Sequence, residues 1–285
     1  MRFFLFLTFF LSLYGGLHLY WYAKLKRAFA IGPKASAGCL LFILVMLLAP
    51  IVTRILERNH LELSARSLAY VGYIWMGYLF LFFAFGLATD AYRILVAGTT
   101  RLTGVGTLWQ LSARQAFCLP LVVALVAVCV GYHSACNIGV EKVSLQTPKL
   151  SSEVGRLKIA QISDVHLGLV VGAGRLQKIV KVIAAEKPDL LVSTGDLIDG
   201  RFKAMTGLAP LIRSIPTPLG KYAVTGNHEF YAGLPMALEV TRQAEVEDDR
   251  LTLRRHHDVA GLEISVDHAA LMRVLHCFTD PGEQR

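Results

Sequence analysis

The stretch Ile162-Ser163-Asp164-Val165-His166-Leu167-Gly168 places a carboxylate and an imidazole two residues apart, directly after an apolar run. Two later stretches have a similar form, Gly195-Asp196-Leu197-Ile198-Asp199 and Gly226-Asn227-His228-Glu229. Each follows a short apolar segment of the kind that forms buried β-strands. The three stretches therefore predict a single site that is built where three strands end.

The segments between these stretches have the spacing of helices, with Leu176, Ile179, Val180 and Ile183 on one face. We expect strands at 157–162, 190–193 and 221–225, and helices at 174–186, 205–215 and 230–244. Strands that alternate with helices indicate an α/β domain with a parallel sheet and right-handed crossovers. In such sheets ligands bind at the carboxyl ends of the strands, which is where the three stretches lie.

The first 135 residues are much more apolar than the rest of the chain. Charge-free spans cover about residues 3–23, 35–52, 68–88 and 116–132. A helix needs ~20 such residues to cross a bilayer, and backbone in hydrocarbon must satisfy its own hydrogen bonds. The sequence therefore predicts an all-α transmembrane region, 1–135, of four helices. For the first span a cleaved signal peptide is the alternative. Spans without ionisable residues do not favour transport, and His18 is expected to pack.

The net charge of +8 is scattered, with no basic stripe interleaved with aromatic residues, so nucleic acid is not an expected partner. Basic residues instead flank the apolar spans. The cluster Lys24, Lys26, Arg27 and Lys34 follows the first span, which favours an N-terminus outside the cell under the positive-inside rule. Four spans return the chain to that side, so the C-terminal domain is predicted to be extracytoplasmic.

The residue types in the three stretches are those of a metal centre. Asp164, His166, Asp196 and Asn227 offer the carboxylate, imidazole and amide groups that bind divalent cations. A glycine before Asp196 leaves room for its carboxylate to reach two ions. Two metals ~3.5–4 Å apart can bind a phosphate, activate a water and hold the leaving oxygen in line.

Two further residues have the chemistry to assist such a centre. His228 follows a ligand position and is expected to be catalytic, either by donating a proton to the leaving oxygen or by stabilising the developing charge. Asp199, three residues after Asp196, is expected to orient the His228 ring. Each motif alone is common in turns, but three of them in this order, each at a strand end, form a specific signal.

Together these motifs resemble those of the calcineurin-like metallophosphoesterases, and more narrowly the bacterial branch with membrane spans ahead of the phosphoesterase domain. The resemblance covers roughly residues 157–235. It implies a β sandwich flanked by helices, two divalent metal ions (manganese, iron or zinc), and hydrolysis of phosphomonoesters or phosphodiesters. By position, it implies that Asp164 and His166 bind the first metal, Asp196 bridges both, Asn227 binds the second and His228 is catalytic.

The chain departs from the family pattern after the third stretch. The family continues with a further histidine and a Gly-His-x-His segment that completes both metal shells, but no Gly-His dipeptide follows Gly226. The remaining histidines have no matching context: His256, His257, His268 and His276. The second metal is therefore expected to lack part of its shell.

These patterns give the expected organisation of the C-terminal half. Residues 136–155 are predicted to be a polar linker, 156–240 the N-terminal half of a phosphoesterase domain, and 241–285 a divergent tail of a truncated or frameshifted member. The predicted function is a metal-dependent phosphoesterase anchored in a bacterial cell membrane, acting on a phosphate ester that is lipid-linked or envelope-derived. The alternative is an inactive truncated relative that serves as a membrane or binding protein.

Overall fold

The computed structural model divides the chain into two compact units, Met1–Cys136 and Asn137–Arg285. It describes residues 2–104, 109–147, 150, 154–199, 207–248 and 272–279. The two units are described separately below.

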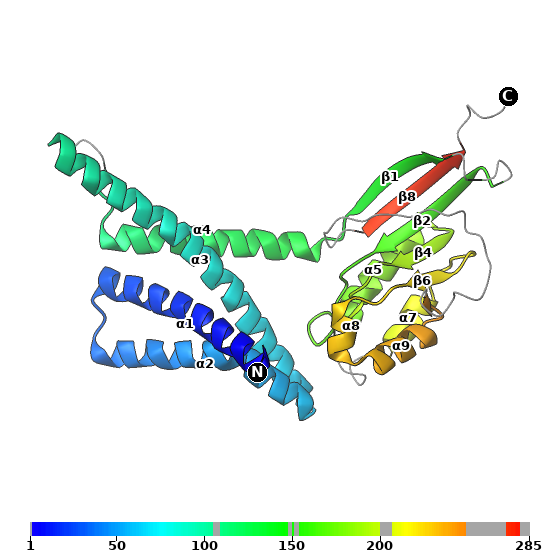
Figure 1. Cartoon of the computed structure of the whole chain (residues 1–285), viewed down its shortest axis with the longest axis horizontal. Coiled ribbons are helices and arrows are strands. Elements are labelled where there is room, and N and C mark those ends of the chain that lie inside the picture. Colours follow the sequence, from blue (N-terminus) through cyan, green and yellow to red (C-terminus); the bar gives the residue numbers. More distant parts are fainter. Residues whose placement is uncertain are drawn as a thin grey trace. The chain divides into compact units, whose positions relative to one another are not determined.

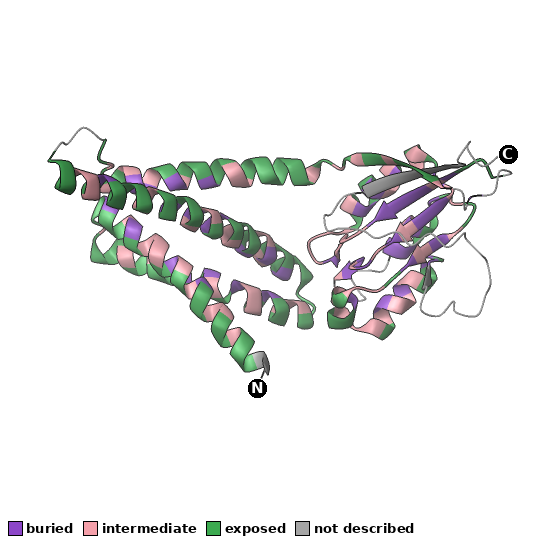
Figure 2. Cartoon of the chain, turned by 45° about the horizontal axis from the view of Figure 1, so that its top comes forward, coloured by how far each residue is buried: buried purple, intermediate pink, exposed green. Residues whose placement is uncertain are grey.

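The first unit consists of four helices, shown in Figure 1: α1 (Arg2–Phe29), α2 (Pro33–Arg58), α3 (Glu62–Thr103) and α4 (Ala113–Cys136). Each contains a window that is long and apolar enough to cross a membrane, and only 11–22% of each window is buried within the protein. Exposed residues accordingly cover most of these helices in Figure 2. Apolar surface of this extent is typical of helices that face lipid. The prediction of four apolar helices is confirmed, and each helix extends beyond its predicted span at both ends.

Aromatic side chains fill the interior of this unit. The rings of Trp21 in α1 and Trp75 in α3 meet edge to face, with centroids 5.5 Å apart. His18 is fully buried. The Trp75 Nε1–H group donates to His18 Nε2 at 2.9 Å, so His18 Nδ1 carries the proton and donates to the Tyr14 carbonyl at 2.8 Å. Since both ring nitrogens have partners, His18 has the packing role expected of it.

The second unit is built on a six-stranded sheet with the order β1-β8-β2-β4-β6-β7 (Figure 1). Its strands are β1 (Val140–Thr147), β2 (Arg156–Ile162), β4 (Leu190–Ser193), β6 (Lys221–Ala223), β7 (Glu247–Asp248) and β8 (Met272–Thr279). Strands β2, β4, β6 and β7 run parallel, as expected, whereas β8 is antiparallel to β2 and parallel to β1. A short parallel ladder also joins β3 (Leu167–Gly168) to β5 (Ile198–Asp199).

The helices of this unit are α5 (Ala173–Glu186), α7 (Leu208–Arg213), α8 (Asn227–Ala232) and α9 (Leu234–Gln243). In α5, Leu176, Ile179 and Ile183 form the buried face and join the main core. The single helix expected at 230–244 is instead two helices. Gly233 separates them with a φ of 114°, a conformation that ends an α-helix.

Part of the expected linker is a strand. Within 136–155, β1 pairs with β8 along its whole length. The polar composition of this stretch concealed two partly buried side chains, Val140 and Val143, which pack against the core clusters of the unit. The sheet also takes up two segments of the expected tail, β7 and β8. The architecture is thus four apolar helices followed by a sheet-and-helix domain. In the part of the chain that the structure describes, the second sheet of a sandwich is not seen beyond the β3–β5 ladder.

Candidate metal centre

The three motif stretches lie at the carboxyl ends of the adjacent parallel strands β2, β4 and β6. Asp164 and His166 follow β2. Asp196 follows β4, and Asp199 ends β5. Asn227 is the first residue of α8, which begins a few residues after β6. Parallel strands bring these loops to one edge of the sheet, as the sequence predicts.

Backbone hydrogen bonds hold the first two loops against each other. The N–H groups of Asp164, His166 and Leu167 donate to the carbonyls of residues 195, 196 and 197, at 3.2, 2.9 and 2.8 Å. These bonds continue the pairing of β2 with β4 into the β3–β5 ladder. The backbone positions that carry Asp164, His166 and Asp196 are therefore held close to one another by these bonds.

Asp164, His166 and Asp196 all have left-handed backbone conformations, with φ of 52°, 50° and 50°. Residues other than glycine seldom adopt this region, and each such residue costs on the order of 1 kcal/mol or more. Strain of this kind persists where the surrounding structure enforces it, commonly at functional sites. Three instances in two facing loops single out this edge of the sheet.

Potential ligand atoms converge here in two groups. Asp164, His166 and Asp196 each offer an atom within 4.8 Å of the others, and so do His166, Asp199 and His228. His166 belongs to both groups, and its ring centroid lies 4.4 Å from that of His228. All five residues are partly exposed, so the groups are open to solvent on one side.

His228 is held by contacts to both neighbouring acids. Its Nδ1 lies 3.0 Å from Asp199 Oδ1, an ion-pair distance although the angles are not those of a good hydrogen bond. Its backbone N–H donates to Asp196 Oδ1 at 3.0 Å. The start of α8 is thereby tied to the loop after β4, and the His228 ring is placed beside the ligand groups.

One buried nitrogen indicates that the residues fit a metal ion. His166 Nδ1 is inaccessible to solvent and has no hydrogen-bond partner among the residues that the structure describes. A buried polar atom without a partner costs about 1–3 kcal/mol. Coordination of a cation would satisfy a ring nitrogen of this histidine, and the carboxylates of Asp164 and Asp196 would balance the charge.

Glu229 has a structural role that sequence analysis did not assign. Its carboxylate is 3% exposed. Oε1 accepts the N–H of Ile198, and Oε2 accepts the N–H of Gly226, both at 2.8 Å. One side chain thus connects the second and third loops. The available signal was a glutamate three residues after Gly226, the position from which a side chain reaches back to the N-cap N–H.

Close packing explains the glycines of the second and third stretches. A Cβ atom on Gly226 would lie 2.1 Å from Asp196 Oδ1 and 2.8 Å from the Asp196 backbone nitrogen. Gly195 in turn faces the Gly226 backbone and has a φ of 111°. Side chains at either position would push the two loops apart.

The structure therefore brings Asp164, His166, Asp196, Asp199 and His228 into the two ligand groups and places Asn227 directly before His228. The later histidines considered from the sequence are not informative about the second metal shell. His256, His257 and His268 lie outside the described residues, and His276 lies in β8, of which the backbone alone is described.

Comparison with known proteins agrees with this geometry. Residues 157–266 match the family model of the calcineurin-like phosphoesterases. An uncharacterized metallophosphoesterase of Aquifex aeolicus is 41% identical over 122 residues, 42% of this chain and 46% of the relative. A zebrafish (Danio rerio) transmembrane protein with a metallophosphoesterase domain is 30% identical over 169 residues, 59% of this chain and 38% of the relative.

A third relative is a UDP-2,3-diacylglucosamine pyrophosphatase, LpxG, of Chlamydia muridarum. It is 36% identical over 84 residues, 29% of this chain and 26% of the relative. The chain spans less than half the length of each of these relatives. No solved structure gives a significant match.

Proposed function

We propose that this chain, which carries a calcineurin-like phosphoesterase domain and has bacterial metallophosphoesterase homologues, is a membrane-anchored phosphoesterase that uses two divalent metal ions. The observation that carries the proposal is the convergence of Asp164, His166 and Asp196 at adjacent strand ends, with ligand atoms within 4.8 Å of one another. Manganese, iron and zinc all suit this mixture of imidazole and carboxylate groups.

In this proposal Asp164 and His166 hold the first metal, Asp196 bridges to the second and Asn227 binds the second. When bound, such ions polarise the phosphoryl group and supply a nucleophilic water at neutral pH. Backbone contacts between the first two loops hold the chain at Asp164, His166 and Asp196, so that little rearrangement of these three ligands is needed when a metal binds.

His228 is proposed to donate a proton to the leaving oxygen of the ester. The Asp199 carboxylate lies beside Nδ1, which orients the ring and leaves Nε2 as the donor. The hydrogen bond from the His228 backbone N–H to Asp196 holds His228, the proposed proton donor, close to the metal ligands. Asp199 would thus be a positioning residue, acting through His228.

We further propose that the substrate is a phosphate ester or anhydride on a lipid-linked or envelope molecule. Four candidate membrane helices would keep the phosphoesterase domain near a membrane, and one relative is a pyrophosphatase of UDP-2,3-diacylglucosamine. The basic residues in the last turn of α1 favour placement of this domain on the extracytoplasmic side of a bacterial cell membrane.

The full chain in detergent, loaded with Mn²⁺, should hydrolyse an aryl phosphodiester or monoester, with metal content measured on the same sample. Asp196→Asn should abolish turnover and lower the metal content. Glu239→Gln is the matched control, because it removes an exposed carboxylate of α9 that pairs with Arg242. Turnover that survives in EDTA would contradict the proposal.

A metal content near zero in the unaltered chain, with no turnover of either ester, would support the alternative of an inactive relative. Metal content and turnover together distinguish an active enzyme from an inactive relative, because both variants and the parent share the same membrane unit. Metal binding without turnover of these two esters would instead direct the search to pyrophosphate anhydrides.

A further inference from the structure

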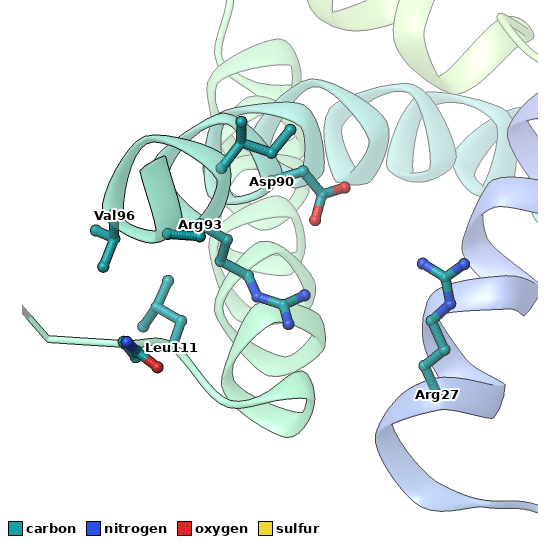
Figure 3. Close-up of a pocket in the computed structure, with 8 residues that line it drawn as sticks. Arg27, Asp90, Arg93, Val96 and Leu111 are labelled. Carbon is teal, nitrogen blue, oxygen red and sulfur yellow. The ribbon is translucent and has the colours of Figure 1, made fainter. Parts of the chain in front are cut away.

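A second polar site lies in the membrane unit. A cavity of about 510 Å³ opens between the end of α1, the last third of α3 and the segment that precedes α4. The side chains of Arg27, Asp90 and Arg93 point into this space (Figure 3). The rest of the described lining is Gln110 and apolar residues, among them Ile94, Val96 and Leu111.

The Asp90 carboxylate at the cavity is already paired with a cation, Lys24. Lys24 is 7% exposed, and its Nζ lies 2.7 Å from Asp90 Oδ1. The Tyr20 hydroxyl donates to Asp90 Oδ2 at 2.7 Å. Both carboxylate oxygens are therefore engaged within the bundle, and the negative charge of Asp90 is compensated by Lys24.

The two arginines are not paired in this way, although Arg93 lies close enough to Asp90 to attract it electrostatically. Neither Arg27 nor Arg93 forms a salt bridge or hydrogen bond within the described part of the chain. Two guanidinium groups thus face one cavity with a net positive charge. Guanidinium groups bind phosphate oxygens through paired, charge-assisted hydrogen bonds, which is the chemistry this arrangement offers.

The position of the cavity fits the headgroup layer of a membrane. Helix α3 has 42 residues, which at ~1.5 Å per residue is about twice the ~30 Å of a bilayer's hydrocarbon core. Its last third, with Arg93, therefore extends past the hydrocarbon. The same end of the bundle carries Lys26, Arg27 and Lys34, the cluster that attracts anionic lipid surfaces.

We propose that this cavity is a phosphate-binding site, in which Arg27 and Arg93 together hold the phosphate group of an anionic lipid headgroup or of a free phosphate ion. The apolar lining suits the glycerol and upper acyl region of a lipid, and the Lys24–Asp90 pair holds α1 and α3 at the spacing that the two arginines need. The proposal is independent of the metal centre and its activity.

The test uses the full chain in neutral detergent with EDTA present, so that the metal centre contributes no phosphate binding. Thermal unfolding of the helices is followed while phosphatidylglycerol, phosphatidylcholine or inorganic phosphate is titrated. We expect phosphatidylglycerol to raise the melting temperature saturably. Arg27→Gln with Arg93→Gln should weaken its apparent affinity by about tenfold or more, since two charge-assisted contacts are lost.

Lys26→Gln with Lys34→Gln is the matched control, because it removes two positive charges at the same end of the bundle but outside the cavity lining. This control should keep the affinity within about twofold. An arginine-dependent response to inorganic phosphate alone would support the site and identify a free ion as its ligand. The proposal would be overturned if neither phosphatidylglycerol nor inorganic phosphate gave an arginine-dependent response. An equal loss of affinity in the lysine control would also overturn it.

Discussion

Substitution of Gly226 by alanine tests whether the second and third loops approach as closely as the structure shows. The new Cβ would lie 2.1 Å from Asp196 Oδ1, whereas ordinary contacts begin at 3.4 Å. Rotation of the Asp196 side chain cannot relieve the clash fully, because the Cβ would also lie 2.8 Å from the Asp196 backbone nitrogen. The loops must therefore separate, and the Asp196 carboxylate must retreat by about 1.3 Å.

Two magnitudes follow from that displacement. Forcing an extra carbon into close packing costs about 1–3 kcal/mol, which should speed amide exchange at the loop contacts by about 5- to 150-fold. A misplacement of about 1 Å in a catalytic group costs about 100-fold in rate. We therefore expect phosphoesterase activity to fall by about 100-fold or more, with a matching loss of bound metal.

The chain offers a close control for this substitution. Gly172 precedes α5 as Gly226 precedes α8, with nearly the same backbone angles (φ −99° and ψ −166°, against −96° and −168°). A Cβ on Gly172 would meet nothing within 4 Å. Hydrogen–deuterium exchange at the His166 amide, which donates to the Asp196 carbonyl, should therefore change in Gly226→Ala alone. Equal behaviour of the two variants in exchange and activity would refute the reasoning.

Three further perturbations address other contacts of the chain. Glu229→Ala leaves the backbone N–H groups of Ile198 and Gly226 without their acceptor. Amide exchange at these two positions should therefore accelerate by an amount worth about 2–4 kcal/mol, and an unchanged rate would contradict this role of Glu229. Hydrogen bonding to Lys158 holds the pKa of Glu186 below its usual value of 4.5, so the pair adds stability above that pH and loses it as the pH falls. The melting temperature of Lys158→Met should therefore fall less steeply below about pH 4.5 than that of the parent chain. An equally steep fall in both would contradict this role of the pair. Lys34→Cys and Tyr231→Cys are made separately in a chain without other cysteines, and intact cells are treated with a membrane-impermeant maleimide. The Tyr231→Cys variant alone should be labelled, and labelling of the Lys34→Cys variant alone would mean the opposite topology.

The sequence was most informative where chemistry and apolar patterning coincide. The strand expected at 190–193 is β4, and that expected at 157–162 is β2 extended by one residue. β4 begins with a short apolar run and β2 is mostly apolar, and each is followed by a small polar residue and then by Asp164 or Gly195, so their limits are visible without tertiary information. The six site residues could be selected for the same reason. Each motif alone is common in turns, but three of them in order, each after a predicted strand, form a specific signal.

The features that could not be predicted depend on contacts between distant segments. Strand β1 is formed by a polar stretch whose pairing partner, β8, lies more than a hundred residues later. The left-handed conformations of Asp164 and Asp196 result from the hydrogen bonds that join their loops. Helices α8 and α9 were expected as one, because the spacing of apolar residues does not reveal the turn that Gly233 makes between them.

The contacts among the three loops also bear on how a metal would bind. Each loop is joined to another through groups that are not proposed ligands: backbone hydrogen bonds link the first and second, and the Glu229 carboxylate links the second and third. The energy that orders the loops is therefore supplied by the fold. In such a preformed site the binding energy of the cation is not consumed in ordering the chain. His166 Nδ1 is buried and has no hydrogen-bond partner among the residues that the structure describes, and this is a cost of that preformation which a bound cation is suited to relieve.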